Sequence, residues 1–374
     1  MQKKSIIVAL FVFLVAAAPL CGAYLSGEEA SLFATFPPLT HAVEHPPFSW
    51  PVFLLYSVPA LVCLLCIGLI FSAAWSKPST PVSKAAATRG KFPWWGWAAL
   101  VLLGLAWMLA WTRFDWFAPV QRHTFIPLWF SSIIVANALC LRLSGSSPLL
   151  HQPRFFWSLF PLSAVFWWFF EYLNQFVNNW YYVGVDYGAL AYSVHATISF
   201  STVLPAVYTT MVLLANFRWF SCRAMDVPPL QRNVPVHLSL AYTVPALALS
   251  FAGLAAMGLW PEQLFSLVWL APLVMLWSLK HMAGLPTLLQ KALHGNLRPL
   301  LSAALAALIC GFFWEMWNYC SMAKWMYSIP YVQRFALFEM PVLGYMGYLP
   351  FGVLCIEIVE LLRNEKHERG SKLP

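Results

Sequence analysis

Two acidic side chains lie inside long apolar stretches of this chain, each with the same neighbours. Residues 165–182 read VFWWFFEYLNQFVNNWYY, and residues 309–327 read ICGFFWEMWNYCSMAKWMY. The shared pattern is a glutamate, an asparagine three residues later and a closing Trp-x-Tyr pair: Glu171, Asn174, Trp180 and Tyr182, then Glu315, Asn318, Trp325 and Tyr327. A carboxyl group in hydrocarbon is costly and by default indicates function. As acid and base, such a pair could move protons on a bound substrate.

Long apolar runs must position these residues. Of the 374 residues, 60% are hydrophobic and only 10% are charged, and the mean hydropathy is +0.67. Several runs approach the roughly 20 residues that span a bilayer, so the composition predicts an all-α polytopic membrane protein. About ten transmembrane helices are expected, at residues 5–25, 50–75, 93–112, 124–143, 155–178, 190–215, 236–258, 262–280, 300–320 and 341–362.

Basic residues predict the orientation of these spans. If Lys3 and Lys4 lie in the cytoplasm, 18 of the 22 Lys and Arg residues fall on the cytoplasmic side. This positive-inside bias predicts a multi-pass protein of a bacterial-type cytoplasmic (inner) membrane, with both termini in the cytoplasm. The first span has the short basic start of a signal peptide with a cleavage position near Ala23, but we interpret it as an uncleaved anchor. The outer side keeps Arg113, Arg122, Lys324 and Arg334.

The repeated pattern extends beyond the glutamates. LRLSGSSPLL precedes the first copy and SLKHMAGLPTLL the second, and Pro205 and Pro350 are separated by 145 residues, as are Trp180 and Trp325. This predicts two four-helix parallel repeats, related by a pseudo-twofold axis along the membrane normal. The predicted divisions are an N-terminal helix pair (1–75) with an outer loop (26–49), a cytoplasmic linker (76–92), repeat 1 (93–215), a second cytoplasmic linker (216–235), repeat 2 (236–362) and a cytoplasmic tail (363–374).

The depth of the two glutamates follows from the helix rise. Each lies about sixteen residues from the cytoplasmic start of its helix, roughly 24 Å into a core of about 30 Å. Glu171, Asn174 and Asn178 share one helical face because they are spaced i, i+3, i+7. If the repeats pack about the twofold axis, these faces could meet in one outward-opening cavity, with His195 as a neighbour. In the alternative interpretation each glutamate only hydrogen-bonds a neighbouring helix and holds the bundle together.

Aromatic residues around the glutamates suggest the kind of substrate. Aromatic faces beside a proton donor suit a developing carbocation in a polyene, a quaternary ammonium head group or a sugar. Residues Trp314–Asn318, then Trp325 and Tyr327, then Pro341, resemble the small membrane lycopene cyclases and related carotenoid hydratases. The resemblance covers about thirty residues and implies isoprenoid chemistry. Those cyclases carry paired glutamates after the proline, where this chain has Val342-Leu343-Gly344.

The outer loop contains a second candidate site. His41, Glu44 and His45 match the H-x-x-E-H pattern of inverted zinc proteases. That mechanism needs the histidines on one helical face, and the prolines at 37–38 and 46–47 disfavour a helix here. A simpler metal or haem contact through the same three residues stays open, because His and carboxylate suit several ions. The interpretation we prefer is a loop folded over the outer mouth of the cavity.

Three function classes fit these patterns. The preferred one is an enzyme doing acid-base chemistry on an amphiphilic or isoprenoid lipid. A proton-coupled transporter or lipid flippase is the second, although residues 155–166 and 300–309 offer no ionisable group for a pathway through the cytoplasmic half. A structural or assembly subunit is the third. Membrane lipids are the expected partners, and no nucleic-acid patch is present, since the net charge of +8 comes mostly from short loops. The sequence does not tell which cofactor, if any, the protein uses, nor its oligomeric state.

Overall fold

A computed structural model describes residues 2–38, 40–76, 90–217, 220 and 236–363. The chain is an all-α, membrane-embedded protein with very little sheet. Within the described residues, eight helices are long and apolar enough to cross a membrane. The ten predicted spans all coincide with helical segments. The two outside that set of eight are residues 153–177, which form one long helix, and 267–282, which form a shorter apolar one. The count of ten spans therefore stays a prediction.

The principal helices vary from 12 to 27 residues in length. They are α1 (Gln2–Leu25), α2 (Trp50–Ser76), α3 (Trp94–Trp111), α4 (Phe125–Ser144), α6 (Pro153–Val177), α7 (Ala189–Phe200), α8 (Val203–Leu214), α10 (Val236–Leu259), α12 (Leu267–Met282), α14 (Arg298–Tyr319) and α15 (Tyr348–Leu362). Short helices connect them: η1 (Ala30–Phe33), η3 (Asp115–His123), α5 (Pro148–His151), α11 (Pro261–Leu264), α13 (Leu288–Leu293) and η5 (Val342–Gly347). The strands are β1 (Trp180–Val183), β2 (Lys324–Tyr327), β3 (Ala336–Leu337) and β4 (Met340–Pro341).

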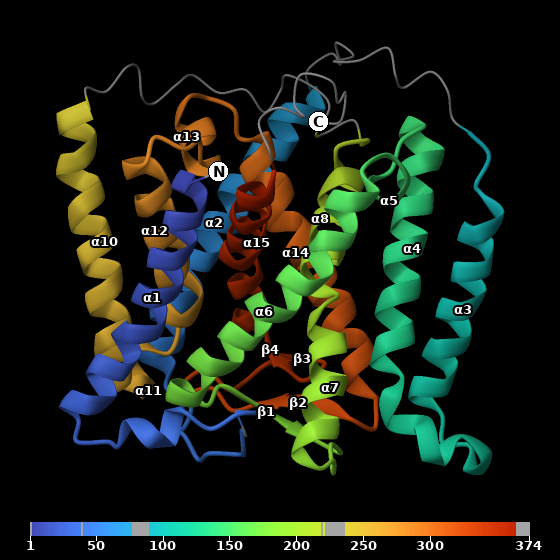
Figure 1. The fold of residues 1–374 in the computed structure, drawn as a ribbon, viewed down its shortest axis with the longest axis horizontal. Coiled ribbons are helices and arrows are strands. Elements are labelled where there is room, and N and C mark those ends of the chain that lie inside the picture. The colour runs from blue at the N-terminus through green and yellow to red at the C-terminus, as the bar shows by residue number, and fades with distance from the viewer. Residues whose placement is uncertain (1, 39, 77–89, 218–219, 221–235, 364–374) are drawn as a thin grey trace.

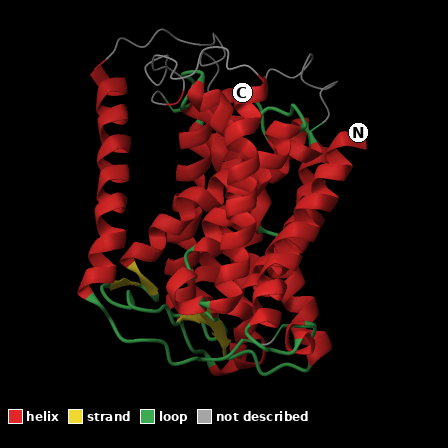
Figure 2. Cartoon of the chain, turned by 90° about the vertical axis from the view of Figure 1, so that its left-hand side faces the viewer, coloured by secondary structure: helices red, strands yellow, loops and turns green. Residues whose placement is uncertain are grey.

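The bundle has two different ends. Both strand pairs lie at one end, which is the lower end in Figure 1 and again in Figure 2. The first residues of α1 and the last residues of α15 lie at the other end (Figure 1). There the Lys4 side chain donates to the backbone carbonyls of Glu360, at 3.2 Å, and Arg363, at 2.5 Å. The predicted linkers 76–92 and 216–235 and the tail 363–374 fall mostly outside the described residues.

Corresponding elements recur at a constant distance along the chain. Helices α6 and α14 begin at residues 153 and 298, and α8 and α15 begin at residues 203 and 348. Both pairs are separated by 145 residues. In the first half α3 packs against α4, while α4 and α6 pack against α8. In the second half α10 packs against α12, while α12 and α14 pack against α15. This spacing is the one expected for the predicted parallel repeat, which stays a prediction.

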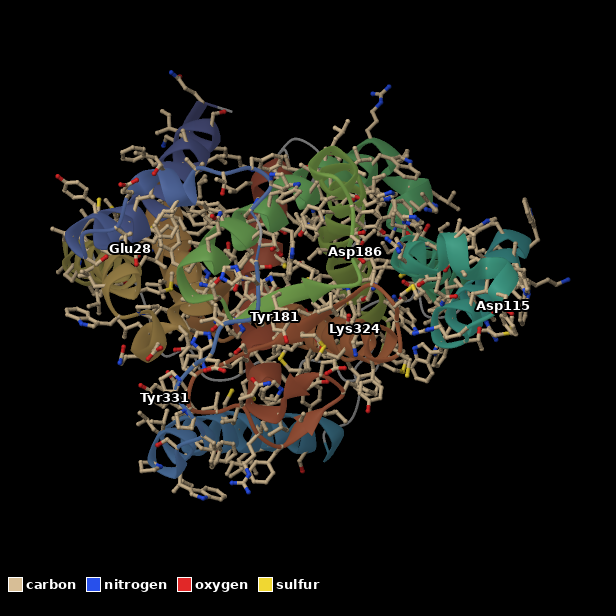
Figure 3. All side chains as sticks on the ribbon, turned by 90° about the horizontal axis from the view of Figure 1, so that it is seen from below. Glu28, Asp115, Tyr181, Asp186, Lys324 and Tyr331 are labelled. Atoms are coloured by element: carbon tan, nitrogen blue, oxygen red, sulfur yellow. The ribbon has the colours of Figure 1, made fainter. Side chains whose placement is uncertain are left out.

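Strands β1 and β2 join the two halves at the lower end. They pair antiparallel, with Trp180 opposite Tyr327 and Tyr182 opposite Trp325. The register is symmetric about the pair Tyr181 and Met326. Figure 3 views this end of the molecule and shows Tyr181 and Lys324 near its middle. A two-stranded ribbon alone is marginally stable in water, so its hold on the bundle depends on the side chains described below.

The two N-terminal helices occupy different places. Helix α1 packs closely against α10, where a Cβ atom on Gly22 would lie only 1.8 Å from the carbonyl oxygen of Ala255. Helix α2 contacts η5 instead. The loop between them runs from near Glu28 past Tyr181 toward Tyr331 (Figure 3). Backbone bonds anchor it there, from Ser49 N to the Tyr331 carbonyl at 2.9 Å and from Tyr331 N to the Pro46 carbonyl at 3.2 Å.

Candidate functional site

Glu171 is completely buried near the lower end of α6 and accepts three hydrogen bonds on one oxygen. Trp167 Nε1, one helical turn earlier, donates to Oε1 at 2.9 Å. From β1, Trp180 Nε1 donates at 3.0 Å and the Tyr182 hydroxyl at 2.6 Å. The other carboxyl oxygen, Oε2, is buried and has no partner within the described residues. A carboxyl group at 0% exposure is thus held by aromatic donors alone.

Glu315 in α14 has the same type of environment. The Tyr327 hydroxyl donates to its Oε1 at 2.7 Å and Trp325 Nε1 at 3.3 Å, both from β2. The third donor differs, because the Tyr348 hydroxyl at the start of α15 donates at 2.8 Å. Gly311, four residues before Glu315, makes room for Tyr348: a Cβ atom there would lie 2.4 Å from the tyrosine ring. Glu315 Oε2 is again buried without a partner among the described residues.

The asparagines of the repeated pattern hold the strands. Asn174 donates through Nδ2 to the carbonyl of Trp180 at 2.7 Å, and its Oδ1 accepts from the Asn179 backbone N–H at 2.9 Å. Asn318 donates to the carbonyl of Trp325 at 2.8 Å and accepts from the N–H of the same residue at 2.9 Å. Each asparagine therefore fixes the strand that supplies the donors to the preceding glutamate. Both lie outside the cavity described below.

Asn178 has a different place from the one that its spacing suggests. It ends α6 in the left-handed conformation, with φ 48° and ψ 38°, and its N–H donates to the carbonyl of Asn174. Left-handed backbone is a frequent way to end a helix, and Asn tolerates it better than most residues. The helix stops here, so Asn178 does not continue the face that carries Glu171, and it does not line the cavity.

Strand geometry explains the Trp-x-Tyr spacing. Alternate residues of a strand point to the same face, so Trp180 and Tyr182 face Glu171 together. The antiparallel register places Trp325 and Tyr327 beside them. Gly184 then bends the chain, with φ 70°, and a Cβ atom there would meet the Met322 carbonyl oxygen at 2.3 Å. Burial, and then the neighbouring glutamate, raise the pKa values of the Tyr182 and Tyr327 hydroxyls well above the ordinary value, so both retain their protons.

A cavity of about 160 Å³ lies among these aromatic side chains. Its lining comes from both halves of the chain and is mostly apolar. The lining residues are Arg122, His123, Phe125, Ile126, Trp167, Trp180, Tyr182, Val185, Tyr187, Tyr192, His195, Ala196, Ser199, Phe200, Val203, Trp269, Trp314, Ala323, Lys324, Trp325, Tyr327, Met340, Gly344, Gly347 and Tyr348. A dry cavity of about 150 Å³ admits benzene, so this one admits a ring or a short stretch of hydrocarbon chain.

The glutamates themselves do not line the cavity. Their hydrogen-bond donors do, because Tyr182, Tyr327 and Tyr348 all appear in its wall. The sequence predicts carboxyl groups facing a shared hollow, whereas the structure puts one layer of aromatic side chains between each carboxyl and the hollow. Trp180, Trp325 and His195, predicted as site residues, are also in the wall. Any effect of Glu171 or Glu315 on a ligand therefore passes through a tyrosine hydroxyl or an indole N–H.

One end of the cavity carries polar side chains that the sequence does not group together. His123 from η3 and His195 from α7 stack with ring centroids 4.4 Å apart. The Tyr187 hydroxyl lies 3.3 Å from His123 Nδ1, and the Arg122 guanidinium lies 5.5 Å from the centre of the Tyr187 ring. Burial, then His195 and Arg122, lower the pKa of His123. Lys324, on β2, lines the same cavity and pairs with Glu339 at 2.5 Å. The sequence gives little sign of this grouping, because the residues come from elements far apart in the chain.

A buried ion pair lies toward the opposite end of the bundle. Lys280 of α12 and Glu357 of α15 pair there with 2% and 0% exposure. Trp277 Nε1 donates to Glu357 at 2.8 Å, and the backbone N–H of Leu288 donates at 2.6 Å. The two charges neutralise each other, and Glu357 also accepts from two further donors. The pair therefore has no free group that could bind a ligand. This pair joins α12, α13 and α15, and sequence reasoning missed it.

The H-x-x-E-H segment does not form a helix. Residues 41–49 are irregular, and His41 and Glu44 are exposed. His45 contacts the carbonyl oxygen of Asn178 through Nε2 at 3.4 Å. Among the described residues, no group of three or more His, Cys, Asp and Glu side chains is placed to hold a metal ion. The loop crosses this end of the bundle, where the Ser328 hydroxyl donates to the Val43 carbonyl at 2.7 Å, but it does not line the cavity.

Fold and site together define a membrane-embedded helical protein with an aromatic cavity at one end, backed by two buried carboxyl groups. Comparison with protein-family models, with curated proteins and with solved structures gives no match. The functional argument therefore depends on the geometry of the site.

Proposed function

We propose that this protein is a membrane enzyme that carries out acid-base chemistry on an amphiphilic or isoprenoid lipid. The observation that carries the proposal is the hydrogen bonding between cavity-lining tyrosines and buried carboxyl groups: Tyr182 to Glu171 at 2.6 Å, and Tyr327 to Glu315 at 2.7 Å. An apolar pocket with a few convergent polar groups is the usual form of a small-molecule site. Here the apolar walls suit a hydrocarbon chain, and the hydroxyls are the groups that could exchange protons with it.

The direction of these bonds defines a proton relay. A substrate proton passes to the tyrosine oxygen, while the tyrosine proton passes to Oε1 of the glutamate. The glutamate becomes a neutral acid, and the tyrosine is again a hydroxyl. The reverse movement delivers the proton from the acid to the substrate. With one relay in each half, Glu171 can act as base while Glu315 acts as acid, or the reverse.

The two relays correspond to each other in the proposed duplication. We propose that residues 93–215 and 236–362 are parallel repeats, in keeping with the shared 145-residue offset and the symmetric register of β1 and β2. Each repeat supplies a glutamate, an asparagine that holds the following strand and a Trp-x-Tyr pair. The cavity between them then forms where corresponding aromatic residues of the two repeats meet.

A transporter is less well supported. Beyond the cavity α14 and α15 pack closely, since a Cβ atom on Gly352 of α15 would lie 2.3 Å from the carbonyl oxygen of Ala303 in α14. The buried Lys280–Glu357 pair locks the same end. Alternating access would require both features to separate. A scaffold role remains the alternative for the glutamates, because each one also ties a strand to its helix.

Mass spectrometry of lipids retained by the purified protein tests the proposal. We expect wild type to retain a lipid or polyene product. The variant Glu315→Gln should retain an unconverted precursor of different mass, because the relay through Tyr327 is broken. Glu262→Gln is a matched control, since Glu262 lies in α11 outside the cavity wall, and it should match wild type. An empty wild-type cavity in a normally assembled protein would instead favour the scaffold.

A further inference from the structure

The polar end of the cavity is built to receive negative charge. Arg122 from η3 and His195 from α7 meet there beside Tyr187, and Lys324 from β2 lines the same cavity. None of the carboxylates in the described part of the chain forms an ion pair with Arg122. Its guanidinium instead lies over the ring of Tyr187. A planar guanidinium offers a fork of N–H donors that suits phosphate oxygens.

The two stacked histidines at this end differ in their hydrogen bonding. His195 Nδ1 is buried and has no hydrogen-bond partner among the described residues, and an unpartnered buried polar atom costs free energy. The ring stacked on it, His123, contacts the Tyr187 hydroxyl through Nδ1, and burial and its neighbours lower its pKa. An anion between these rings and Arg122 would give His195 Nδ1 a partner and favour protonation of His123.

The rest of the cavity differs sharply from this end. Beyond the histidines the wall consists chiefly of indole and phenol rings, including Trp167, Trp269 and Trp314. A ligand that fills the cavity must therefore join an anionic group to a hydrocarbon chain. A phosphate group offers several acceptor oxygens and up to two negative charges, enough to meet Arg122, the histidines and Tyr187 together.

We propose that this end of the cavity binds the phosphate head group of a single-chain phosphate monoester whose hydrocarbon chain enters the aromatic part. The assignment rests on the proposed function, because it names the class of lipid that the same cavity receives. Arg122 pairs with the phosphate oxygens, His195 donates through the ring nitrogen that now lacks a partner, and the aromatic walls hold the first carbons of the chain.

Calorimetric titration of the full-length protein in nanodiscs tests this assignment, with empty nanodiscs as the blank. The probes are octyl phosphate, octanol, octanoate and inorganic phosphate. We expect octyl phosphate to bind wild type more tightly than every other probe. Arg122→Gln should weaken octyl phosphate by about 10- to 100-fold, the cost of losing a charged hydrogen-bonding partner, and leave octanol unchanged. Arg334→Gln removes the same charge at the same end but outside the cavity wall, and it should bind like wild type.

The outcomes separate the two proposals. Equal affinity for octyl phosphate and octanol, or equal losses in Arg122→Gln and Arg334→Gln, would overturn the head-group site and leave the apolar cavity of the proposed function in place. Inorganic phosphate binding as tightly as octyl phosphate would identify a free phosphate site, and octanoate doing so would exclude the phosphate assignment. If no octyl compound binds above the blank, the proposed function itself fails. Should Arg122→Gln not fold, His195→Gln provides the same comparison, with a loss for octyl phosphate only.

Discussion

A single carboxyl oxygen that accepts three donors is an unusual use of a glutamate. Glu171 and Glu315 each concentrate their bonds on Oε1 and leave Oε2 buried without a partner. A purely structural carboxylate gains most when both oxygens are satisfied. All the donors meet at Oε1, the oxygen that takes up the proton in the proposed relay, and a change of protonation there breaks no bond at Oε2.

Removal of one hydrogen-bond donor measures how strongly Tyr348 and Glu315 are coupled. Tyr348→Phe deletes the hydroxyl that donates to Glu315 at 2.8 Å, and we expect a loss of about 1 kcal/mol in the free energy of unfolding, as for other hydrogen bonds. In the Glu315→Gln background, Tyr348→Phe should lower the free energy of unfolding by less, because the acceptor there is a neutral amide that cannot become a carboxylate. Reversible unfolding in detergent measures all four states of this double-mutant cycle. Additive effects would show that the hydroxyl and the carboxyl act independently.

The titration of His123 predicts how the stability of the free protein depends on pH. His123 faces Arg122 on its own element, His195 on α7 and Tyr187 after β1, and Lys324, paired with Glu339, lines the same cavity. Burial and the first two of these lower the pKa of His123, so the folded protein binds fewer protons than the unfolded chain below about pH 6.5. The stability of the free protein should therefore fall as the pH falls through that range.

A bound anion opposes that trend because it favours the protonated form of His123. The affinity for octyl sulfate, whose own charge is constant between pH 8 and pH 5.5, should rise on acidification. In His123→Gln the rise should be much smaller. Calorimetry at several pH values in one ionic strength checks both expectations, and an affinity that is flat in wild type would contradict a role for the histidines in anion binding.

Among the elements, the contact of α14 with α15 determines where Tyr348 can lie. Gly311 permits it, since a Cβ atom would be 2.4 Å from the ring of Tyr348. Gly311→Ala should force the ring away from Glu315 and cost about 1–3 kcal/mol through overpacking. Gly104→Ala in α3 is the matched control. No atom from another described helix or from a side chain beyond its chain neighbours lies within 4 Å of the added methyl group, and the change should be neutral or slightly stabilising. Equal melting temperatures for the two variants would show that Tyr348 can move without loss.

The sequence predicts helices far better than it predicts the ribbon. Apolar runs define the helical segments, because spanning a bilayer demands about 20 apolar residues whatever their neighbours are. Strands β1 and β2 have only four residues each. Their pairing depends on Asn174 and Asn318, which bind the backbone across a turn. The spacing identifies those asparagines correctly as part of the pattern but not as strand anchors, since a helical wheel cannot show where a helix ends.

The polar end of the cavity was beyond prediction for a related reason. In the sequence, Arg122 and Lys324 are two of the few basic residues on the predicted outer side, and His195 is a predicted site residue beside the glutamates. Their convergence depends on η3, α7 and β2 meeting in space, and no local periodicity reports this. The surroundings of the carboxyl groups are also only partly predictable. Position along the helix predicts that the carboxyl groups lie near the outer end. The aromatic layer that covers them, however, comes from strands about ten residues further along the chain.

For the molecule as a whole, the two ends of the bundle have different tasks. One end carries the ribbon, the cavity and the loop that crosses them. At the other end α14 packs closely on α15, and the Lys280–Glu357 pair joins α12 to α15. A ligand that enters and leaves by one end needs no passage between the helices. This difference between the ends favours a lipid-modifying site open to one leaflet over a route across the membrane.

Orientation in the membrane then decides which leaflet supplies the substrate. The distribution of Lys and Arg predicts that one end of the bundle faces the cytoplasm. This is the end with the first residues of α1 and the last residues of α15. Green fluorescent protein fused after residue 374 should therefore fluoresce. Alkaline phosphatase fused after residue 45 should be active, and a fusion after residue 84 should be inactive. The reverse pattern would place the ribbon and the cavity in the cytoplasmic leaflet. The proposed relay and head-group site would then take lipids from that leaflet, and the positive-inside interpretation of this chain would be wrong.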